Sequence, residues 1–351
     1  MAEPVAAGVA LASLTTLRLG GGAHDLVEVE TADDLVETVR RLDDAGEPVL
    51  VLGGGSNVVV GDDGFAGTVV LVRSRGIRVD SDACSGAMVT VQAGEPWDEL
   101  VAHAVRQGWV GIEALAGIPG LVGAVPIQNV GAYGQEVSQT IANVRAYDRQ
   151  ARKVTTFAAS ECGFGYRHSR FKGEPGRFVV LAVTFQLALG DLSAPVGYAE
   201  LARALGVAVG DRAPARSVHD AVLSLRRGKG MVLDPDDHDT WSAGSFFTNP
   251  VLTVEEADRL PPDAPRFAQP DGRVKSSAAW LIDRAGFAKG YKSPSGTGAA
   301  ALSAKHTLAL TNRGDATTSD LLDLAREIRA VVREKFGITL VNEPVLVACE
   351  L

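Results

Sequence analysis

The sequence of 351 residues predicts an α+β fold, and three patterns support that class. An amphipathic helix and two short β-branched runs alternate between residues 31 and 72. Apolar segments typical of strands recur between residues 88 and 187, and a long amphipathic helix followed by an apolar run closes the chain. With 46% hydrophobic and 22% charged residues, the composition is that of a globular protein of two or three domains.

The first element is a helix expected over residues 31–46. Thr31 is a suitable N-cap, acidic residues occupy the first turn, and Gly46 is a typical helix stop. Its apolar stripe consists of Leu35, Val39 and Leu42. Short strands are expected at residues 48–52 and 68–72, with a glycine-rich connection between them.

The rest of the chain continues this pattern. A helix is expected over residues 96–107 with Gly108 as its stop, and further helices over residues 276–286 and 319–335, the last ending at Gly337. The remaining strands are expected at residues 88–92, 144–147, 154–157, 178–187 and 338–347.

Composition argues against several classes of protein. A formal charge of −9 does not suit a nucleic-acid-binding surface. Cys84, Cys162 and Cys349 are an odd, widely spaced set, which indicates reduced thiols, and the histidines lack metal-ligand spacing. No apolar run approaches the roughly 18 residues of a membrane helix, and no basic segment starts a signal peptide. We therefore expect a cytoplasmic protein without a metal or a membrane partner, and a loose leader over the first dozen residues.

The most informative stretch is residues 115–134, LAGIPGLVGAVPIQNVGAYG. Its glycines and prolines disfavour a helix or a central strand, so an ordered loop is expected. At Gly117, Gly120 and Gly123 the backbone could approach a ligand, and the exposed N–H groups could bind phosphate oxygens. A tight apolar connection between buried elements is the alternative.

A second glycine cluster follows an apolar strand in VLVLGGGSN, residues 49–57. Two such loops suggest one shared nucleotide ligand. Neither loop is a Rossmann fingerprint, because the third glycine is not at the required offset and no helix follows directly. The sequence contains no Walker A motif.

Five motifs together resemble those of the UDP-N-acetylenolpyruvoylglucosamine reductase (MurB) family. They are GGGSN (53–57), IPGLVGAVPIQNVGAYG (118–134), GYRHSRFK (165–172), GSFFTNP (244–250) and NEP (342–344). They occur in the order typical of the family, and the similarity extends from Thr16 to Val347. Five ordered motifs are far more specific than a single glycine loop.

The resemblance implies a fold and an activity. It implies an FAD-binding domain of the vanillyl-alcohol-oxidase/PCMH type with two α/β subdomains, at residues 1–73 with 338–351 and at 74–214, and a C-terminal α+β substrate-binding domain at 215–337. FAD would be non-covalent and NADPH the co-substrate. The reaction would convert UDP-N-acetylglucosamine enolpyruvate into UDP-N-acetylmuramate for peptidoglycan synthesis, and so serve cell shape and division, in a cytoplasmic monomer.

Three motif residues match the family's catalytic positions. The resemblance assigns enolate stabilisation to Arg167, proton donation at C2 to Ser245, and assistance at the substrate carboxylate to Glu343. Without the resemblance, a surface arginine, a turn serine and an edge charge are the plainer interpretations. His168, next to Arg167, is expected to be a hydrogen-bonded structural histidine.

The family's binding positions also map onto this chain. Tyr198, the mobile-loop tyrosine of the longer type I form, Lys229 and Asn249 match substrate-binding residues. Arg226 and Arg227 add to a basic cluster that could offset a diphosphate, or could form a solvated basic turn. The expected FAD contacts are Gly53, Gly54, Gly55, Ser56, Asn57, Ile118, Pro119, Gly120, Gly123, Ala124, Gln128, Asn129 and Gly131.

Two rival functions remain. A different FAD oxidase or dehydrogenase could use the same flavin domain, but it would usually need its own acid or base and often a His or Cys flavin tether. A non-catalytic flavin or sugar-nucleotide sensor could keep only the binding loops. The joint presence of Arg167, Ser245 and Glu343 favours the reductase, because a sensor needs no proton donor.

Overall fold

The computed structural model describes residues 6–82 and 86–351. The chain forms two compact units, each assembled from segments that are distant in sequence. Unit 1 comprises Met1–Val9, Ala23–Gly54 and Ala66–Gly228; unit 2 comprises Ala10–Gly22, Gly55–Phe65 and Lys229–Leu351. The three domains expected from the sequence remain a prediction beside this division.

The first part of unit 1 is a small sheet with one helix. The sheet order is β1 (Ala6–Ala7), β2 (Ala23–Val29), β5 (Phe65–Val72) and β3 (Val49–Leu52), with β3 and β5 parallel. Helix α1 (Ala32–Asp44) begins after Thr31, whose hydroxyl accepts a hydrogen bond from the Asp34 N–H. Leu35, Val39 and Leu42 of α1 are buried as predicted. The predicted helix and both strands of this region are confirmed.

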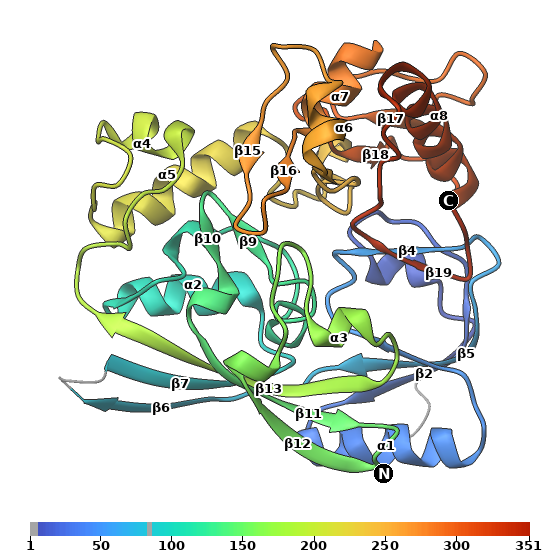
Figure 1. Cartoon of the computed structure of the whole chain (residues 1–351). Coiled ribbons are helices and arrows are strands. Elements are labelled where there is room, and N and C mark those ends of the chain that lie inside the picture. The colour runs from blue at the N-terminus through green and yellow to red at the C-terminus, as the bar shows by residue number, and fades with distance from the viewer. Residues whose placement is uncertain (1–5, 83–85) are drawn as a thin grey trace. The chain divides into compact units, whose positions relative to one another are not determined.

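The second part of unit 1 is a larger antiparallel sheet (Figure 1). Its strands follow the order β12 (Lys153–Ala158), β11 (Ile141–Asp148), β13 (Phe178–Leu189), β7 (Gly86–Gln92) and β6 (Ile77–Asp82), and β8 (Trp109–Val110) pairs with β13. Strands β7, β11, β12 and β13 confirm the predicted segments.

Helices of unit 1 cover one face of this larger sheet. Trp97 and Leu100 of α2 (Trp97–Arg106) pack in one core cluster with Val222 of α5 (Ala215–Gly228) and with inward-facing sheet residues such as Val183 and Phe185. Two shorter helices complete unit 1. Helix α3 (Arg170–Gly173) lies between β12 and β13 in the chain, and α4 (Ala199–Leu205) lies between β13 and α5.

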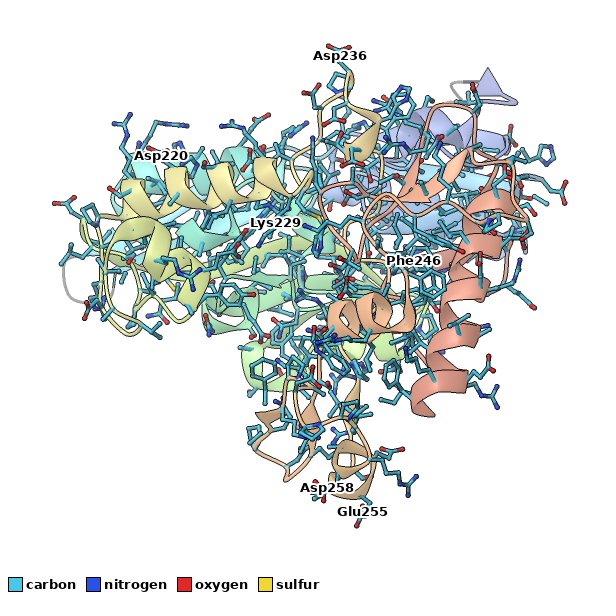
Figure 2. All side chains as sticks on the ribbon, turned by 90° about the horizontal axis from the view of Figure 1, so that it is seen from above. Asp220, Lys229, Asp236, Phe246, Glu255 and Asp258 are labelled. Carbon is cyan, nitrogen blue, oxygen red and sulfur yellow. The ribbon has the colours of Figure 1, made fainter. Side chains whose placement is uncertain are left out.

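Unit 2 is built around α8 (Thr318–Phe336). Thr317 and Asp320 form a capping box at its start, and Gly337 ends it with a φ of 70°. The other helices of unit 2 are α6 (Val254–Asp258) and α7 (Ala278–Ala285). Figure 2 shows Phe246 in the interior of the unit and Asp236, Glu255 and Asp258 at its periphery, as expected from their polarity.

The strands of unit 2 are short. They form three small sheets: β14 (Val251–Leu252), β16 (Val274–Lys275) and β15 (Phe267–Ala268); β17 (Ala300–Leu302) with β18 (Leu310–Asn312); and β4 (Val58–Val60) with β19 (Val345–Val347). The last pair is parallel, so the end of the chain pairs with a segment from its first 60 residues.

Two expectations about the chain ends require correction. The predicted strand at residues 338–347 is reduced to β19, because Val341 and Glu343 bond to the loop at residues 246–248 instead. The expected loose leader over the first dozen residues is wrong where the chain is described, because Ala6–Ala7 form β1 and the buried Leu11 begins a 3₁₀ turn (Leu11–Leu14). Residues 1–5 of that expected leader lie outside the described residues.

The central loop is ordered as predicted. It contains 3₁₀ turns at Glu113–Leu115 and Val122–Ala124, and a two-residue ladder between β9 (Gly131–Ala132) and β10 (Gln135–Glu136). Tyr133 and Gly134 connect β9 and β10 with φ values of 49° and 86°, which is typical of the type I′ turn that joins twisted strands.

The structure also bears on the other sequence expectations. Cys162 and Cys349 are free thiols, and Cys84 lies outside the described residues. In the described part of the chain, no helix has the length and apolar character needed to span a bilayer. Acidic, histidine and cysteine side chains form no metal-binding group within residues 6–82 and 86–351.

Candidate active site

The two glycine loops meet within unit 1. A Cβ atom on Gly54 would lie 2.8 Å from the Cα of Gly120, a separation that real Cβ atoms do not adopt. The Gly120 carbonyl accepts a hydrogen bond of 3.0 Å from the Trp97 N–H at the start of α2. Glycine at position 54 therefore allows two distant segments to form one continuous backbone surface.

The amides of the central loop are less available than the sequence suggested. The Gly117 N–H donates to the Asp98 carboxylate at 2.5 Å, and the Gly123 N–H donates to the Ala93 carbonyl at 2.8 Å. These two amides are engaged within the protein. Of the three glycines expected to meet a phosphate, Gly120 remains the candidate donor.

The GGGSN motif is divided between the two units, with Gly53 and Gly54 in unit 1 and the rest in unit 2. Gly55 has a φ of 60°, and a Cβ there would lie 1.9 Å from the Leu14 carbonyl oxygen. Asn57 is held beside the NEP motif, since the Val345 N–H donates to the Asn57 carbonyl at 3.0 Å. The motif therefore shapes the backbone of both units.

Arg167 occupies the tip of a tight turn. Gly165 and His168 exchange backbone hydrogen bonds, and Arg167 between them has a left-handed φ of 51°. Its guanidinium donates to the Gly131 carbonyl at 2.8 Å and to the Asn129 carbonyl at 3.4 Å. A left-handed backbone conformation at a residue whose guanidinium is oriented by two hydrogen bonds is typical of functional positions.

Gly131 provides space for this arginine. A Cβ on Gly131 would lie 3.2 Å from Nη1 of Arg167 and 2.8 Å from Cγ of Glu136. Asn129 stabilises the same corner: its side-chain amide donates to Glu136 (2.9 Å) and to the Gly165 carbonyl (3.0 Å), and its oxygen accepts from the Ser138 N–H. Gly131 and Asn129, predicted as FAD contacts, thus position Arg167 in the structure.

His168 lies in the same turn as Arg167. The side chain is exposed, and its backbone closes the turn that carries Arg167. The structural role expected of His168 is thus carried by its backbone, while a hydrogen bond of its ring stays a prediction.

Tyr198 caps the start of α4 and is 46% exposed. Its ring makes an edge-to-face contact with Tyr133, with centroids 5.5 Å apart and an interplanar angle of 87°. Gly134 and Gly197 approach closely beside it. The predicted lid tyrosine therefore rests on the turn of the central loop.

Two members of the basic cluster are helical, and the third, Lys229, lies in the turn that follows α5. Arg226 and Arg227 lie in the last turn of α5, and Lys229 is the first residue of unit 2. Burial lowers the pKa of Arg226 to about 10, an effect partly opposed by Tyr133 and Asp98. Arg226 therefore remains charged at neutral pH and faces the central loop, whereas Arg227 is exposed.

Unit 2 brings Ser245 and Glu343 onto neighbouring segments. Phe247 forms an antiparallel bridge with Asn342, and the Glu343 N–H donates to the Phe246 carbonyl at 2.8 Å. Phe246 and Phe247 are both 1% exposed and fix this pairing in the core. Asn249 lies further along the same loop, where its side-chain Oδ1 accepts a hydrogen bond from the Ala278 N–H at the start of α7.

The predicted residues thus form two groups. Gly53, Gly54, the central loop, Arg167 and Tyr198 belong to unit 1, and Gly55, Ser56, Asn57, Lys229, Ser245, Asn249 and Glu343 belong to unit 2. The first group offers a backbone surface and an oriented guanidinium. The second offers a hydroxyl and a carboxylate, which suits acid and base chemistry.

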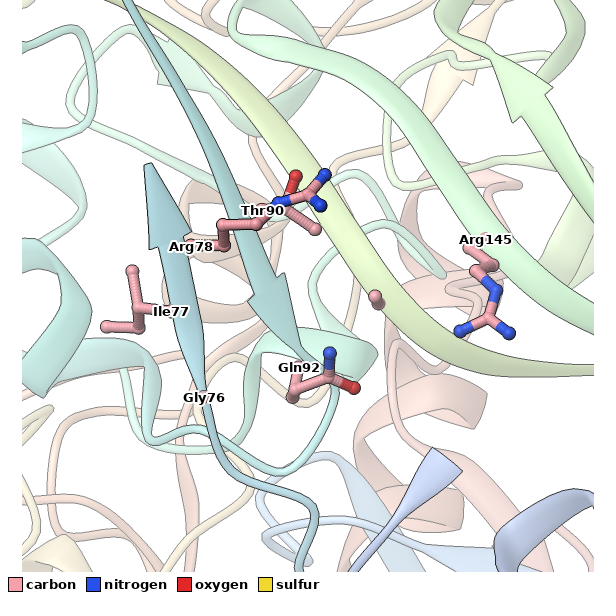
Figure 3. A pocket seen from close by; sticks show the side chains of 7 residues that line it. Gly76, Ile77, Arg78, Thr90, Gln92 and Arg145 are labelled. Atoms are coloured by element: carbon pink, nitrogen blue, oxygen red, sulfur yellow. The ribbon is translucent and has the colours of Figure 1, made fainter. Parts of the chain in front are cut away.

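A separate hollow of about 380 Å³ lies on the other face of the larger sheet (Figure 3). Thr90 and Gln92 line it, and they alternate along β7 with Val89 and Val91, which face the helices. Arg78 and Arg145 also line it, from β6 and β11. None of the predicted site residues lies in this hollow.

Two further residues were missed by the sequence reasoning. Glu113 is fully buried and accepts three hydrogen bonds, one of them from Gln135. A charged residue within an apolar run was the available signal, since carboxylates are almost never fully buried without partners. Tyr133 was visible only as part of a motif, and its contact with Tyr198 depends on tertiary structure.

The fold and the glycine surface define first a class of protein. The sequence model of an FAD-binding domain family matches residues 24–156, which include both glycine loops. The protein is therefore an FAD-dependent oxidoreductase with an FAD-binding domain of the vanillyl-alcohol-oxidase/PCMH type and a further C-terminal α+β part.

The particular family follows from further similarities. The family model described as UDP-N-acetylenolpyruvoylglucosamine reductase, C-terminal domain, matches residues 234–347. A UDP-N-acetylenolpyruvoylglucosamine reductase from Cutibacterium acnes is 58% identical over 343 residues, which cover 98% of this chain and 90% of that protein. One from Thermobifida fusca is 56% identical over 361 residues, which cover 100% of both.

A solved structure agrees. The crystal structure of the reductase from Thermus caldophilus has a TM-score of 0.65 and 27% identity to this chain and covers 97% of each chain. The chain belongs to the UDP-N-acetylenolpyruvoylglucosamine reductase (MurB) family, as the sequence motifs predicted.

Proposed function

We propose that this protein catalyses the NADPH-dependent reduction of UDP-N-acetylglucosamine enolpyruvate to UDP-N-acetylmuramate, as a cytoplasmic monomer. One observation carries the proposal. Ser245 and Glu343 are held on adjacent backbone segments over the buried pair Phe246 and Phe247. A proton donor and a carboxylate fixed together are what reduction of an enolpyruvyl ether requires from a protein.

When bound, FAD would supply the hydride-transfer chemistry between NADPH and C3 of the substrate. The residues present fit this cofactor, because Gly54 and Gly120 form a continuous backbone surface that a Cβ would break. In our proposal this surface and Gln128 bind FAD, and Gly55, Ser56 and Asn57 are further proposed FAD contacts. Neither loop contains His or Cys, so we propose non-covalent binding, and acid precipitation should release all the flavin.

Arg167 would bind the substrate carboxylate. Negative charge grows on that carboxylate as the hydride arrives at C3, and a preorganised guanidinium stabilises this charge without reorganisation cost. The bonds of Arg167 to the Gly131 and Asn129 carbonyls support this role, because they orient the planar fork for bidentate contact. Glu343 would act with Arg167 at the enolic carboxylate.

Ser245 would donate the proton to C2. A serine hydroxyl is a weak acid, but the carbanionic centre at C2 is a strong base, so the transfer is downhill. Gly244, with a φ of 71°, and the two buried phenylalanines support a fixed position for the hydroxyl.

The UDP group of the substrate would have its own binding residues. In our proposal Lys229 and Asn249 bind the nucleotide diphosphate and sugar, and Tyr198 closes over them as a lid. Its 46% exposure and its position at the start of a short helix support a mobile role. Arg226 adds a partly buried positive charge that interacts electrostatically with Tyr133.

A direct assay separates this proposal from a different flavin oxidase and from a sensor. Purified protein is mixed with NADPH and UDP-N-acetylglucosamine enolpyruvate, and absorbance at the nicotinamide band is followed. We expect NADPH oxidation that requires the enolpyruvyl substrate. NADPH oxidation that proceeds at the same rate without the enolpyruvyl substrate would favour a different flavin oxidase. Binding of that substrate without NADPH oxidation would favour a sensor.

A further inference from the structure

The side chain of Glu113 is an unusual feature of unit 1, since it is 0% exposed and lies outside the predicted site. Its Oε2 accepts a hydrogen bond of 2.6 Å from the Gly111 N–H. Its Oε1 accepts from Nε2 of Gln135 at 3.0 Å and from the Ala194 N–H at 2.8 Å. An ionised carboxylate is an acceptor only, so three converging N–H donors suit it.

The three donors come from three different segments. Gly111 precedes the central loop, Gln135 belongs to β10 behind the turn of Tyr133, and Ala194 lies four residues before Tyr198. Gln135 completes the arrangement, because its Oε1 accepts from the Ala114 N–H at 2.8 Å. One buried carboxylate therefore ties the central loop to the segment that leads into the lid.

The segment 193–196, which we call the lid root, is also held on its other side. The Ser193 N–H donates to the Ala213 carbonyl and the Val196 N–H donates to the Asp211 carbonyl, both at 2.8 Å. Val196 is 3% exposed, whereas Gly197 and Tyr198 are exposed. The change from anchored to exposed chain therefore falls between residues 196 and 197.

We propose that Glu113 is a positioning residue for the lid: its carboxylate fixes the lid root to the central loop, so that Tyr198 moves from a defined hinge at residues 196–197. The proposal rests on the proposed role of Tyr198 as a substrate lid. Bonds of a fully buried charge are costly to lose, because an unsatisfied donor keeps its whole desolvation penalty. Glu113 thereby restricts where Tyr198 meets the substrate.

A pair of substitutions isolates the bond to the lid root. In the double variant Glu113→Gln with Gln135→Glu, the new carboxylate at position 135 accepts from the Ala114 N–H and from the new amide at position 113. The oxygen of that amide still accepts from the Gly111 N–H, but its NH₂ group faces the Ala194 N–H. Only the bond to the lid root is lost, while the loop bonds are kept.

Hydrogen exchange measured residue by residue tests the tether without any need for activity. In the double variant the Ala194 amide should exchange at least tenfold faster, while the Ser193 and Val196 amides keep their protection. Unchanged exchange at Ala194 would overturn the tether. General loss of protection in unit 1 would also count against it, since the substitutions would then act on the fold rather than on the lid.

Steady-state kinetics tests the effect on substrate binding. The KM for the enolpyruvyl substrate should rise about fivefold, the factor that corresponds to one lost hydrogen bond of about 1 kcal/mol, with kcat less affected. Asp148→Asn, which removes another buried carboxylate of unit 1, should leave KM unchanged. An exposed Ala194 amide with unchanged KM would contradict the proposal, and an unchanged KM in Tyr198→Phe would instead contradict the lid itself.

Discussion

At the scale of single residues, Gly131 and Arg167 illustrate how glycine serves the candidate site. The glycine-rich central loop suggests backbone that a ligand can approach, and Gly131 also makes room for neighbouring protein atoms, among them Nη1 of Arg167. Glycine at a site can therefore provide space for a neighbouring side chain as well as for a cofactor. The two roles of Gly131 can be distinguished, because a substitution should lower kcat if the glycine makes space for Arg167 and should weaken FAD binding if it contacts the cofactor.

Gly131→Ala should lower kcat about tenfold and leave FAD binding nearly unchanged. The new Cβ would lie 2.8 Å from Cγ of Glu136, 2.9 Å from the Gln135 carbonyl oxygen and 3.2 Å from Nη1 of Arg167, so both the β9–β10 ladder and the guanidinium must shift. Small misplacements of positioning groups reduce the rate strongly. Gly165→Ala is the matched control, because a Cβ there meets His168 at an ordinary 3.9 Å. Loss of FAD together with a normal kcat per bound flavin would show that Gly131 serves the cofactor.

At the scale of elements, the proposed role of Tyr198 as a lid depends on how the segment before it is anchored. Tyr198 is the N-cap residue of α4, and its ring contacts Tyr133. The lid root, residues 193–196, is held by residues 211–213 and by Glu113. This division into an anchored root and an exposed tip is typical of a closing loop.

Tyr198→Phe should raise the KM for the UDP-sugar substrate more than it lowers kcat. The ring and its contact with Tyr133 are retained, while the phenol that would meet a phosphate is removed. Steady-state measurement of KM and kcat distinguishes a role in substrate binding from a role in catalysis. A loss confined to kcat would place Tyr198 among the catalytic groups.

At the scale of the whole molecule, most helices could be predicted from the sequence, whereas contacts between distant residues could not. Helices α1, α2, α7 and α8 were predicted because caps, stripes and stops are local signals. Helix α5 was missed although Val218 and Val222 have helical spacing, since the basic run at its end suggested a turn. The fate of the Gly117 and Gly123 amides and the role of Glu113 could not be predicted, because their partners are distant in sequence.

For the candidate site, the sequence motifs identified the residues but not how the fold pairs them. Motifs identified Arg167, Ser245 and Glu343 by resemblance, and the structure places the last two on adjacent segments through the Phe247 to Asn342 bridge. That pairing joins residues almost 100 positions apart. No periodicity or spacing in the sequence reports such a pairing.

The stability of unit 1 in acid should depend on Asp148, which is 5% exposed. Its hydrogen bonds with Arg177 lower its pKa to about 2, although burial acts in the opposite direction. A lowered folded-state pKa means stabilisation above the unfolded pKa of about 4, which is lost as pH falls towards 2. Asp148→Asn should therefore destabilise the protein at pH 7 and have little effect near pH 2, as measured by denaturant unfolding. An equal destabilisation at both pH values would contradict this linkage.

The central claim is that Ser245 donates a proton to the substrate, and stopped-flow absorbance of the flavin tests it most directly. In the proposed reaction NADPH reduces the flavin before the enolpyruvyl substrate is needed, so Ser245→Ala should leave that first phase nearly intact. Reoxidation by UDP-N-acetylglucosamine enolpyruvate should slow by about 100-fold or more, as is typical for a lost general acid. Reoxidation at the wild-type rate, or an equal loss in the NADPH phase, would contradict the assignment of Ser245.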